Sequence, residues 1–169
     1  MDGLTIPDSN VFTSILALHA LSVVPGKGIP QLCRTLRSRV RDAAEADGTW
    51  RFWRTGEGPR VDADVDVTAC ALAVLCVEPG CAPADARERL LSFRDGEGRF
   101  LTWMRRGDAN DVDAVVNANA CWALGDGDGT ARASAWVLAV LAEGREVACS
   151  PYYDAPAACW YAVARAAAG

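Results

Sequence analysis

Two short acidic pairs are the residues of this sequence best suited to chemistry. Asp64 and Asp66 stand two residues apart at the start of an apolar segment, and Asp111 and Asp113 stand in the same way before another. Residues i and i+2 do not share a face of a helix, so the two members of a pair have different tasks. Because one aspartate suffices as a helix N-cap, the second, Asp66 or Asp113, is available as a general acid or base.

The environment of these carboxyl groups decides their protonation. On two parallel helices, Asp66 and Asp113 would face one cavity at equivalent heights, where each buried carboxyl raises the pKa of the other and keeps one protonated. A helix N-terminus acts in the opposite direction, because its dipole stabilises the charged carboxylate. The structural alternative is that one aspartate of each pair caps a helix and the other favours the helix dipole. The sequence leaves both interpretations open.

Two amides and five aromatic residues complete the candidate site. Asn117 and Asn119 lie in the apolar segment that follows Asp113, where they orient a carboxyl or a bound polar group, or bond to neighbouring backbone. Aromatic side chains line pockets or pack hairpin turns, and either role suits those of this chain. The aromatic residues assigned to substrate binding are Trp53, Trp103, Trp122, Tyr152 and Tyr153.

Composition excludes several classes of function. The chain has 169 residues, 51 % of them apolar, and a net charge of −5, which excludes intrinsic disorder and argues against nucleic-acid binding. The single histidine, His19, excludes mechanisms that need two, and we expect it to be a core residue. Seven cysteines without a CxxC pair are expected to be buried hydrophobes, not zinc ligands. With no apolar run of about 20 residues and no basic leader, we expect a cytoplasmic protein.

An internal repeat predicts the elements that position these residues. Residues 48–53 recur as residues 98–103, each with a Gly-x-aromatic-x-x-Trp pattern, and the acidic pairs follow with a spacing of 47 residues. We interpret the aromatic residues of this pattern as clamps at hairpin turns. Four apolar segments with polar starts alternate with three amphipathic ones of helical spacing. The apolar segments cover residues 7–21, 64–75, 111–124 and 152–167, and the amphipathic ones cover residues 29–46, 83–93 and 130–141.

This alternation predicts an all-α fold of about seven helices in stacked helical hairpins, formed by a single domain over residues 1–169. One class of helix would form an inner wall and the other an outer layer.

The stretch Asp64-Val65-Asp66-Val67-Thr68-Ala69, which opens a helix after a Gly-x-Trp element, resembles the DxDD-T-A motif of squalene-hopene-type and other class II terpene cyclases. The Gly-x-aromatic elements resemble the QW repeats of that family, and the hairpins resemble its α/α toroid. Two departures are that Val67 replaces the last acid of the motif and that Ala44 and Arg94 stand where the QW glutamine belongs.

The resemblance implies a partial toroid that cyclises a polyprenyl substrate by protonation, with Asp66 as the general acid and Asp64 as its supporting carboxylate. Asp113 is added as a further catalytic candidate. No metal site is predicted, and Mg²⁺ enters only if the substrate is a diphosphate. Because the chain has half the helices of a toroid, we expect a homodimer or a partner chain to complete the ring around an isoprenoid or other apolar molecule.

Two other functions remain open. The chain is alternatively a non-catalytic helical-repeat module that binds a lipid or a protein in its concave face, or an enzyme that uses Asp66 and Asp113 on another substrate.

Overall fold

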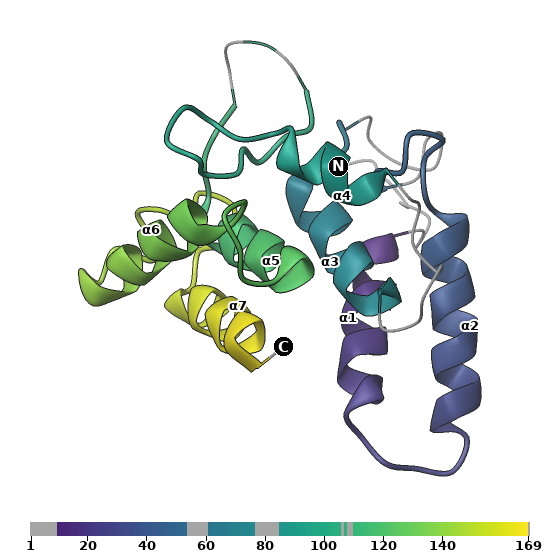
Figure 1. Cartoon of the computed structure of the whole chain (residues 1–169). Coiled ribbons are helices and arrows are strands. Elements are labelled where there is room, and N and C mark those ends of the chain that lie inside the picture. Colours follow the sequence, from purple (N-terminus) through teal and green to yellow (C-terminus); the bar gives the residue numbers. More distant parts are fainter. Residues whose placement is uncertain (1–9, 54–60, 77–84, 106, 108–109, 169) are drawn as a thin grey trace, which may run out of the picture.

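The computed structural model describes residues 10–53, 61–76, 85–105, 107 and 110–168, and these residues form seven helices (Figure 1). The helices are α1 (Val11–Ser22), α2 (Ile29–Asp42), α3 (Val65–Leu75), α4 (Ala86–Leu91), α5 (Ala114–Leu124), α6 (Ala131–Ala142) and α7 (Pro156–Ala168). Extended pairing among the described residues is limited to isolated bridges between the loops. The prediction of an all-α fold with about seven helices is therefore confirmed for this part of the chain.

The contacts divide the helices into two sets. The apolar helices α1, α3, α5 and α7 pack against one another in chain order, while α2 contacts α1, α4 contacts α3, and α6 contacts α5 (Figure 1). Almost every residue of α3 and α5 is buried, because each lies between two apolar neighbours. In the amphipathic α2 only Cys33 and Val40 are buried. We call α1, α3, α5 and α7 the inner helices.

Two helix boundaries differ by four residues from the predicted ones. The helix α2 ends at Asp42, four residues early, because the chain turns so that the amide of Glu45 bonds the Thr49 carbonyl at 2.8 Å. The helix α7 begins at Pro156, whose fixed φ suits a first helical position, so that both tyrosines of the predicted segment lie in the preceding loop. The predicted starts at residues 7–9 and 83–84 lie outside the described residues.

Buried aromatic residues clamp the hairpin turns, as the repeat predicts. Trp50 and Phe100 are both fully buried, and the indole Nε1 of Trp50 donates to the carbonyl of Val40 at 2.7 Å. An inner helix holds the backbone of each clamp: Thr68 Oγ1 accepts from the amide of Trp50 at 3.0 Å. Asn117 Oδ1 accepts from the amide of Phe100 at 2.7 Å. The two repeats therefore use different side chains for the same contact.

The register of the repeat corrects the prediction for the acidic pairs. Asp64 caps α3 and Asp113 caps α5, each accepting hydrogen bonds from amides of the helix it precedes. The capping bonds fix these two residues as equivalents, 49 positions apart, whereas the sequence analysis matched Asp66 with Asp113 at a spacing of 47. In the observed register the equivalent of Asp66 is Val115. Asp66 is therefore specific to one repeat.

None of the described helices is both long and apolar enough to cross a membrane.

Candidate functional site

Asp66 is the centre of a buried polar cluster. It lies in the first turn of α3, where its Oδ1 accepts a hydrogen bond from Asn119 Nδ2 of α5 at 2.5 Å. The hydroxyl of Tyr153, in the loop before α7, donates to Oδ2. The thiol of Cys70, one turn further along α3, lies 4.0 Å from Oδ1. The carboxylate therefore links three segments that are distant in sequence, and both of its oxygens accept from protein donors.

Arg165 of α7 adds a cation to this cluster that sequence reasoning missed. Its side chain is buried, with 7 % of the residue exposed, and its Nη2 donates to Asn119 Oδ1 at 2.5 Å and to Cys70 Sγ at 3.7 Å. The guanidinium carbon lies 4.1 Å from the ring centroid of Trp122, in cation–π geometry. Within the described residues, Nε and Nη1 of Arg165 have no hydrogen-bond partner. The available sequence signal was a lone charge in the otherwise apolar segment 156–168.

Burial dominates the electrostatics of this region. Burial raises the pKa of Asp66, against the opposing effects of the hydrogen bonds from Tyr153 and Asn119 and of the Arg165 charge. Burial, followed by repulsion from Asp66, raises the pKa of Asp64 well above its usual value. The amide bonds at the start of α3 act in the opposite direction but are outweighed. The first turn of α3 therefore favours protonated carboxyl groups.

The side chains of Asp113 and Asn117 form hydrogen bonds with backbone groups. Asp113 Oδ1 accepts from the amides of Val115 and Val116 at 2.7 and 3.1 Å, and its Oδ2 accepts from the amide of Tyr152 at 3.3 Å. Burial raises the pKa of Asp113, while Asp66 is only a minor contributor to that rise. Asn117 Nδ2 donates to the Phe100 carbonyl at 2.9 Å. Asp113 is thus placed as a cap, and Asn117 as a support for the turn.

The predicted aromatic residues are spread over the molecule. Trp103 Nε1 donates to the hydroxyl of Tyr152 at 3.0 Å, and that hydroxyl donates to Asp111 at 2.7 Å. Trp53 packs edge-on against Phe52, with ring centroids 4.7 Å apart. Of the five aromatic residues, Tyr153 alone bonds Asp66, and Trp122 alone lines the pocket described next.

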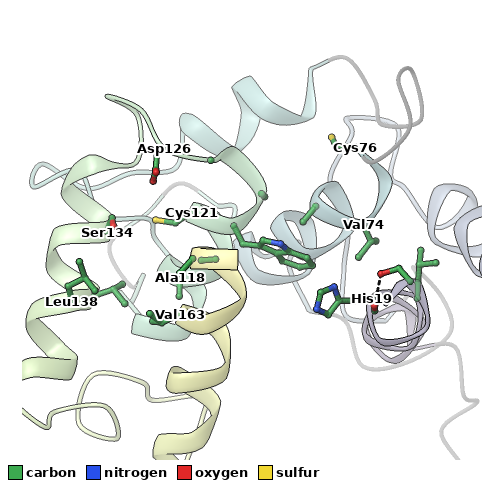
Figure 2. Close-up of a pocket in the computed structure, with 18 of the residues that line it drawn as sticks. His19, Val74, Cys76, Ala118, Cys121, Asp126, Ser134, Leu138 and Val163 are labelled. Carbon is green, nitrogen blue, oxygen red and sulfur yellow. Dashed lines mark hydrogen bonds between the residues drawn. The ribbon is translucent and has the colours of Figure 1, made fainter. Parts of the chain in front are cut away.

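A pocket of about 790 Å³ opens among five of the helices and is also lined by Arg37 of α2 (Figure 2). The imidazole of His19 and the indole of Trp122 meet edge to face in its wall, with centroids 4.9 Å apart. His19 is half-buried here, and burial followed by the charge of Arg165 lowers its pKa. The expectation of a core histidine is therefore corrected, because His19 faces a cavity. The apolar side chains of the lining include Leu18, Val74, Ala118, Val137 and Val163.

The pocket and the aspartates lie at opposite ends of the inner helices. The pocket lining runs from the middle of the inner helices, as at Ala118, to their C-terminal ends, as at Ser22, whereas Asp66 lies in the first turn of α3. At 1.5 Å per residue, the ten residues from Asp66 to Cys76 correspond to about 15 Å along the helix. None of Asp64, Asp66 and Asp113 lines the pocket.

No group of three or more histidine, cysteine or acidic side chains in the described part of the chain is arranged to hold a metal ion. Burial raises the pKa of Cys121, which lines the pocket, to about 11, so its thiol is protonated at neutral pH.

The described residues therefore form an all-α protein with a buried Asp–Asn–Arg cluster and a separate pocket lined by both apolar and polar side chains. No protein-family model matches the chain, and no curated protein matches it in sequence.

Proposed function

We propose that this chain is a non-catalytic binding module, built as part of an α/α toroid, that holds an apolar small molecule of the isoprenoid type. The observation that carries the proposal is the pocket of about 790 Å³ at the C-terminal ends of the inner helices. Its volume lies within the range of small-molecule sites, and its walls combine apolar side chains with polar ones such as His19, Arg37 and Asp126.

The apolar part of the pocket lining suits a hydrocarbon ligand. Leu18, Val74 and Val163 approach from three different inner helices, so that a flexible hydrocarbon contacts apolar side chains on several sides. Burying such a ligand yields about 25 cal/mol for each Å² of apolar surface removed from water. Arg37 of α2 and Asp126 after α5 are the charged residues of the lining, and each offers a partner to a polar group of the ligand.

The buried cluster supports this function by fixing the walls. Asp66, Asn119 and Arg165 join α3, α5 and α7 through consecutive hydrogen bonds. These three helices also supply much of the pocket lining. A pocket whose walls are already fixed binds more tightly, because less conformational freedom is lost on binding. In this interpretation Asp66 is a positioning residue.

Titration with farnesol, followed by calorimetry and by native mass spectrometry, tests the proposal. We expect a one-to-one complex with the wild-type chain and a loss of binding of at least tenfold in Ala73→Phe, which fills the pocket from α3. The matched control is Ala135→Phe on the exposed face of α6, outside the pocket, which should bind as the wild type does. Absence of binding to the wild type, or equal binding by the two variants, would refute the proposal.

A second candidate is protonation-initiated cyclisation of a polyprenyl substrate by Asp66, and its support is the raised pKa of a carboxyl buried beside a second one. A protonated Asp66 would donate its proton to a carbon–carbon double bond, with Asp64 as the neighbouring carboxyl. This role requires Tyr153 to give up its bond to Oδ2 so that substrate can reach the acid.

Incubation with squalene and with geranylgeranyl diphosphate, with and without Mg²⁺, tests the second candidate. Cyclic products from the wild type that disappear in Asp66→Asn, with the helical content unchanged, would establish it. Products that persist in Asp66→Asn, or no products from the wild type, would exclude Asp66 as the acid and leave the binding module as the function.

A further inference from the structure

The large hydrophobic side chains that remain exposed are confined to the two ends of the row of inner helices. Among the described residues, those at the N-terminal end belong to α2 and the turn before it, and those at the C-terminal end belong to α6, α7 and the loop between them. The N-terminal end carries Val23, Val24 and Leu32, and the C-terminal end carries Leu138, Val147, Tyr152, Trp160 and Tyr161. The described parts of α3, α4 and α5 contribute none.

Exposed hydrophobic side chains at both ends are the opposite of what is expected for a stack of helical repeats that stays monomeric. Stacked helical repeats stay soluble when their terminal units present a polar outer face. Here Trp160 and Tyr161 of α7 are 57 % and 51 % exposed, and Val23 and Val24 are 73 % and 51 % exposed. Both ends therefore have the composition of contact surfaces. We define the N-terminal end surface as Val23, Val24 and Leu32, and the C-terminal end surface as Val147, Trp160 and Tyr161.

The two end surfaces have opposite charge. Residues 27–42, beside the N-terminal end surface, include five basic residues and one acidic residue. Beside the C-terminal end surface, Glu143, Glu146 and Asp154 outnumber Arg145, whose side chain is paired with Glu143 at 2.5 Å. Glu146 also accepts a hydrogen bond from the indole of Trp160 at 2.7 Å, which places a carboxylate at the edge of the exposed ring.

We propose that two copies of this chain dock head to tail, with the C-terminal end surface of each copy on the N-terminal end surface of the other. The acidic rim around Trp160 then faces the arginines of α2, which gives attraction and orientation. Contact between two C-terminal end surfaces would instead place Glu143, Glu146 and Asp154 against their own copies, and this repulsion disfavours it.

In the proposed dimer a two-fold axis relates the two copies, so that both head-to-tail contacts are identical and the assembly closes. Closure satisfies both end surfaces of both chains, so no apolar surface is left to extend the assembly into a fibre. A tryptophan at the centre of each interface is the residue type that most often dominates association energy. The proposal does not depend on ligand binding, since the end surfaces lie outside the pocket lining.

Analytical ultracentrifugation of the wild type, of Trp160→Glu and of Val24→Glu tests the proposal. We expect a wild-type dimer and a dimer dissociation constant raised by about 30-fold or more in each variant, the change expected for a contact residue that dominates binding. Ser92→Glu is the control for the added charge, because Ser92 is exposed at the end of α4, away from both ends of the row, and it should dimerise as the wild type does.

Mixing the two variants distinguishes the orientation. Trp160→Glu keeps an intact N-terminal end surface and Val24→Glu keeps an intact C-terminal one, so an equimolar mixture should form heterodimers through a single intact interface. A wild type that stays monomeric at 200 µM would overturn the proposal. It would equally be overturned if Val24→Glu dimerised like the wild type, since the C-terminal end surfaces would then contact each other, or if the mixture formed no heterodimer.

Discussion

Removal of the Asn117 side chain should destabilise the fold more than any comparable change on the surface. Asn117 is fully buried, and it accepts from the amide and donates to the carbonyl of Phe100 at 2.7 and 2.9 Å. In Asn117→Ala both backbone groups lose their side-chain partner in a place without solvent. Each buried unsatisfied group costs about 1–3 kcal/mol, and partial relaxation leads us to expect a loss of about 3 kcal/mol in the free energy of unfolding.

Asn117→Thr serves as a rescue variant, and Asn110→Ala serves as a less buried control. At the equivalent position Thr68 holds the backbone of Trp50 with one hydroxyl, so Asn117→Thr should recover about half of the lost stability. Asn110 makes the same pair of bonds to the backbone of Trp103 but is only half-buried, so Asn110→Ala should cost about 1 kcal/mol because water replaces the amide.

Urea unfolding followed by circular dichroism at 222 nm measures all three variants. A loss below about 1 kcal/mol in Asn117→Ala would refute the assignment of the clamp, since it would fall short of the cost of a single buried unsatisfied group. The same conclusion would follow if Asn117→Thr were no more stable than Asn117→Ala.

Three further changes test other parts of the fold. Asp64→Asn keeps the N-cap. Because the pKa of Asp64 is raised on folding, the wild type loses stability as the pH rises above about 4. In urea titrations the variant should therefore gain stability relative to the wild type as the pH rises above about 4. Trp50→Phe removes a buried indole bond and should lower the free energy of unfolding by about 2 kcal/mol; an unchanged urea midpoint would contradict this role. Gly98→Ala should cost about 1–2 kcal/mol in thermal unfolding, because Gly98 has φ +81° and a Cβ there would lie 2.9 Å from Arg132; equal stability would show that the turn adapts.

The helices could be predicted from the sequence because the patterns that indicate them are local and occur in each repeat. Apolar periodicity, polar N-caps such as Asn10 and Asp64, and the recurring Gly-x-aromatic element each depend on residues near one another in the chain. It was harder to predict which residues of the two repeats correspond to each other. The pairs Asp64/Asp66 and Asp111/Asp113 look alike as text, and only the capping bonds show that Asp113 corresponds to Asp64.

The candidate site was only partly accessible for the opposite reason. Asp66 could be singled out, and Asn119 does orient its carboxyl group, as one of the two interpretations of that amide proposed. Arg165 could not be placed, because its position against Asn119 depends on how α7 packs on α5, 46 residues away in sequence. The pocket likewise consists of residues from six helices that share no motif, such as His19 and Val137.

The positions at which the two repeats differ show where the chain buries polar side chains and gives up stability to do so. Cys70 and Asn119 occupy equivalent positions, 49 residues apart, and both accept from Arg165, whereas Asp66 stands where the other repeat has Val115. A buried polar cluster of this kind contributes little net stability, because the cost of desolvating its members offsets their hydrogen bonds. If this position served only to fill the core, a valine at position 66, like Val115 in the other repeat, would be enough. The cluster is therefore best explained by its role in positioning α7 against α3 and α5. These three helices carry a large part of the pocket lining. In addition, α7 carries the exposed tryptophan of the C-terminal end surface.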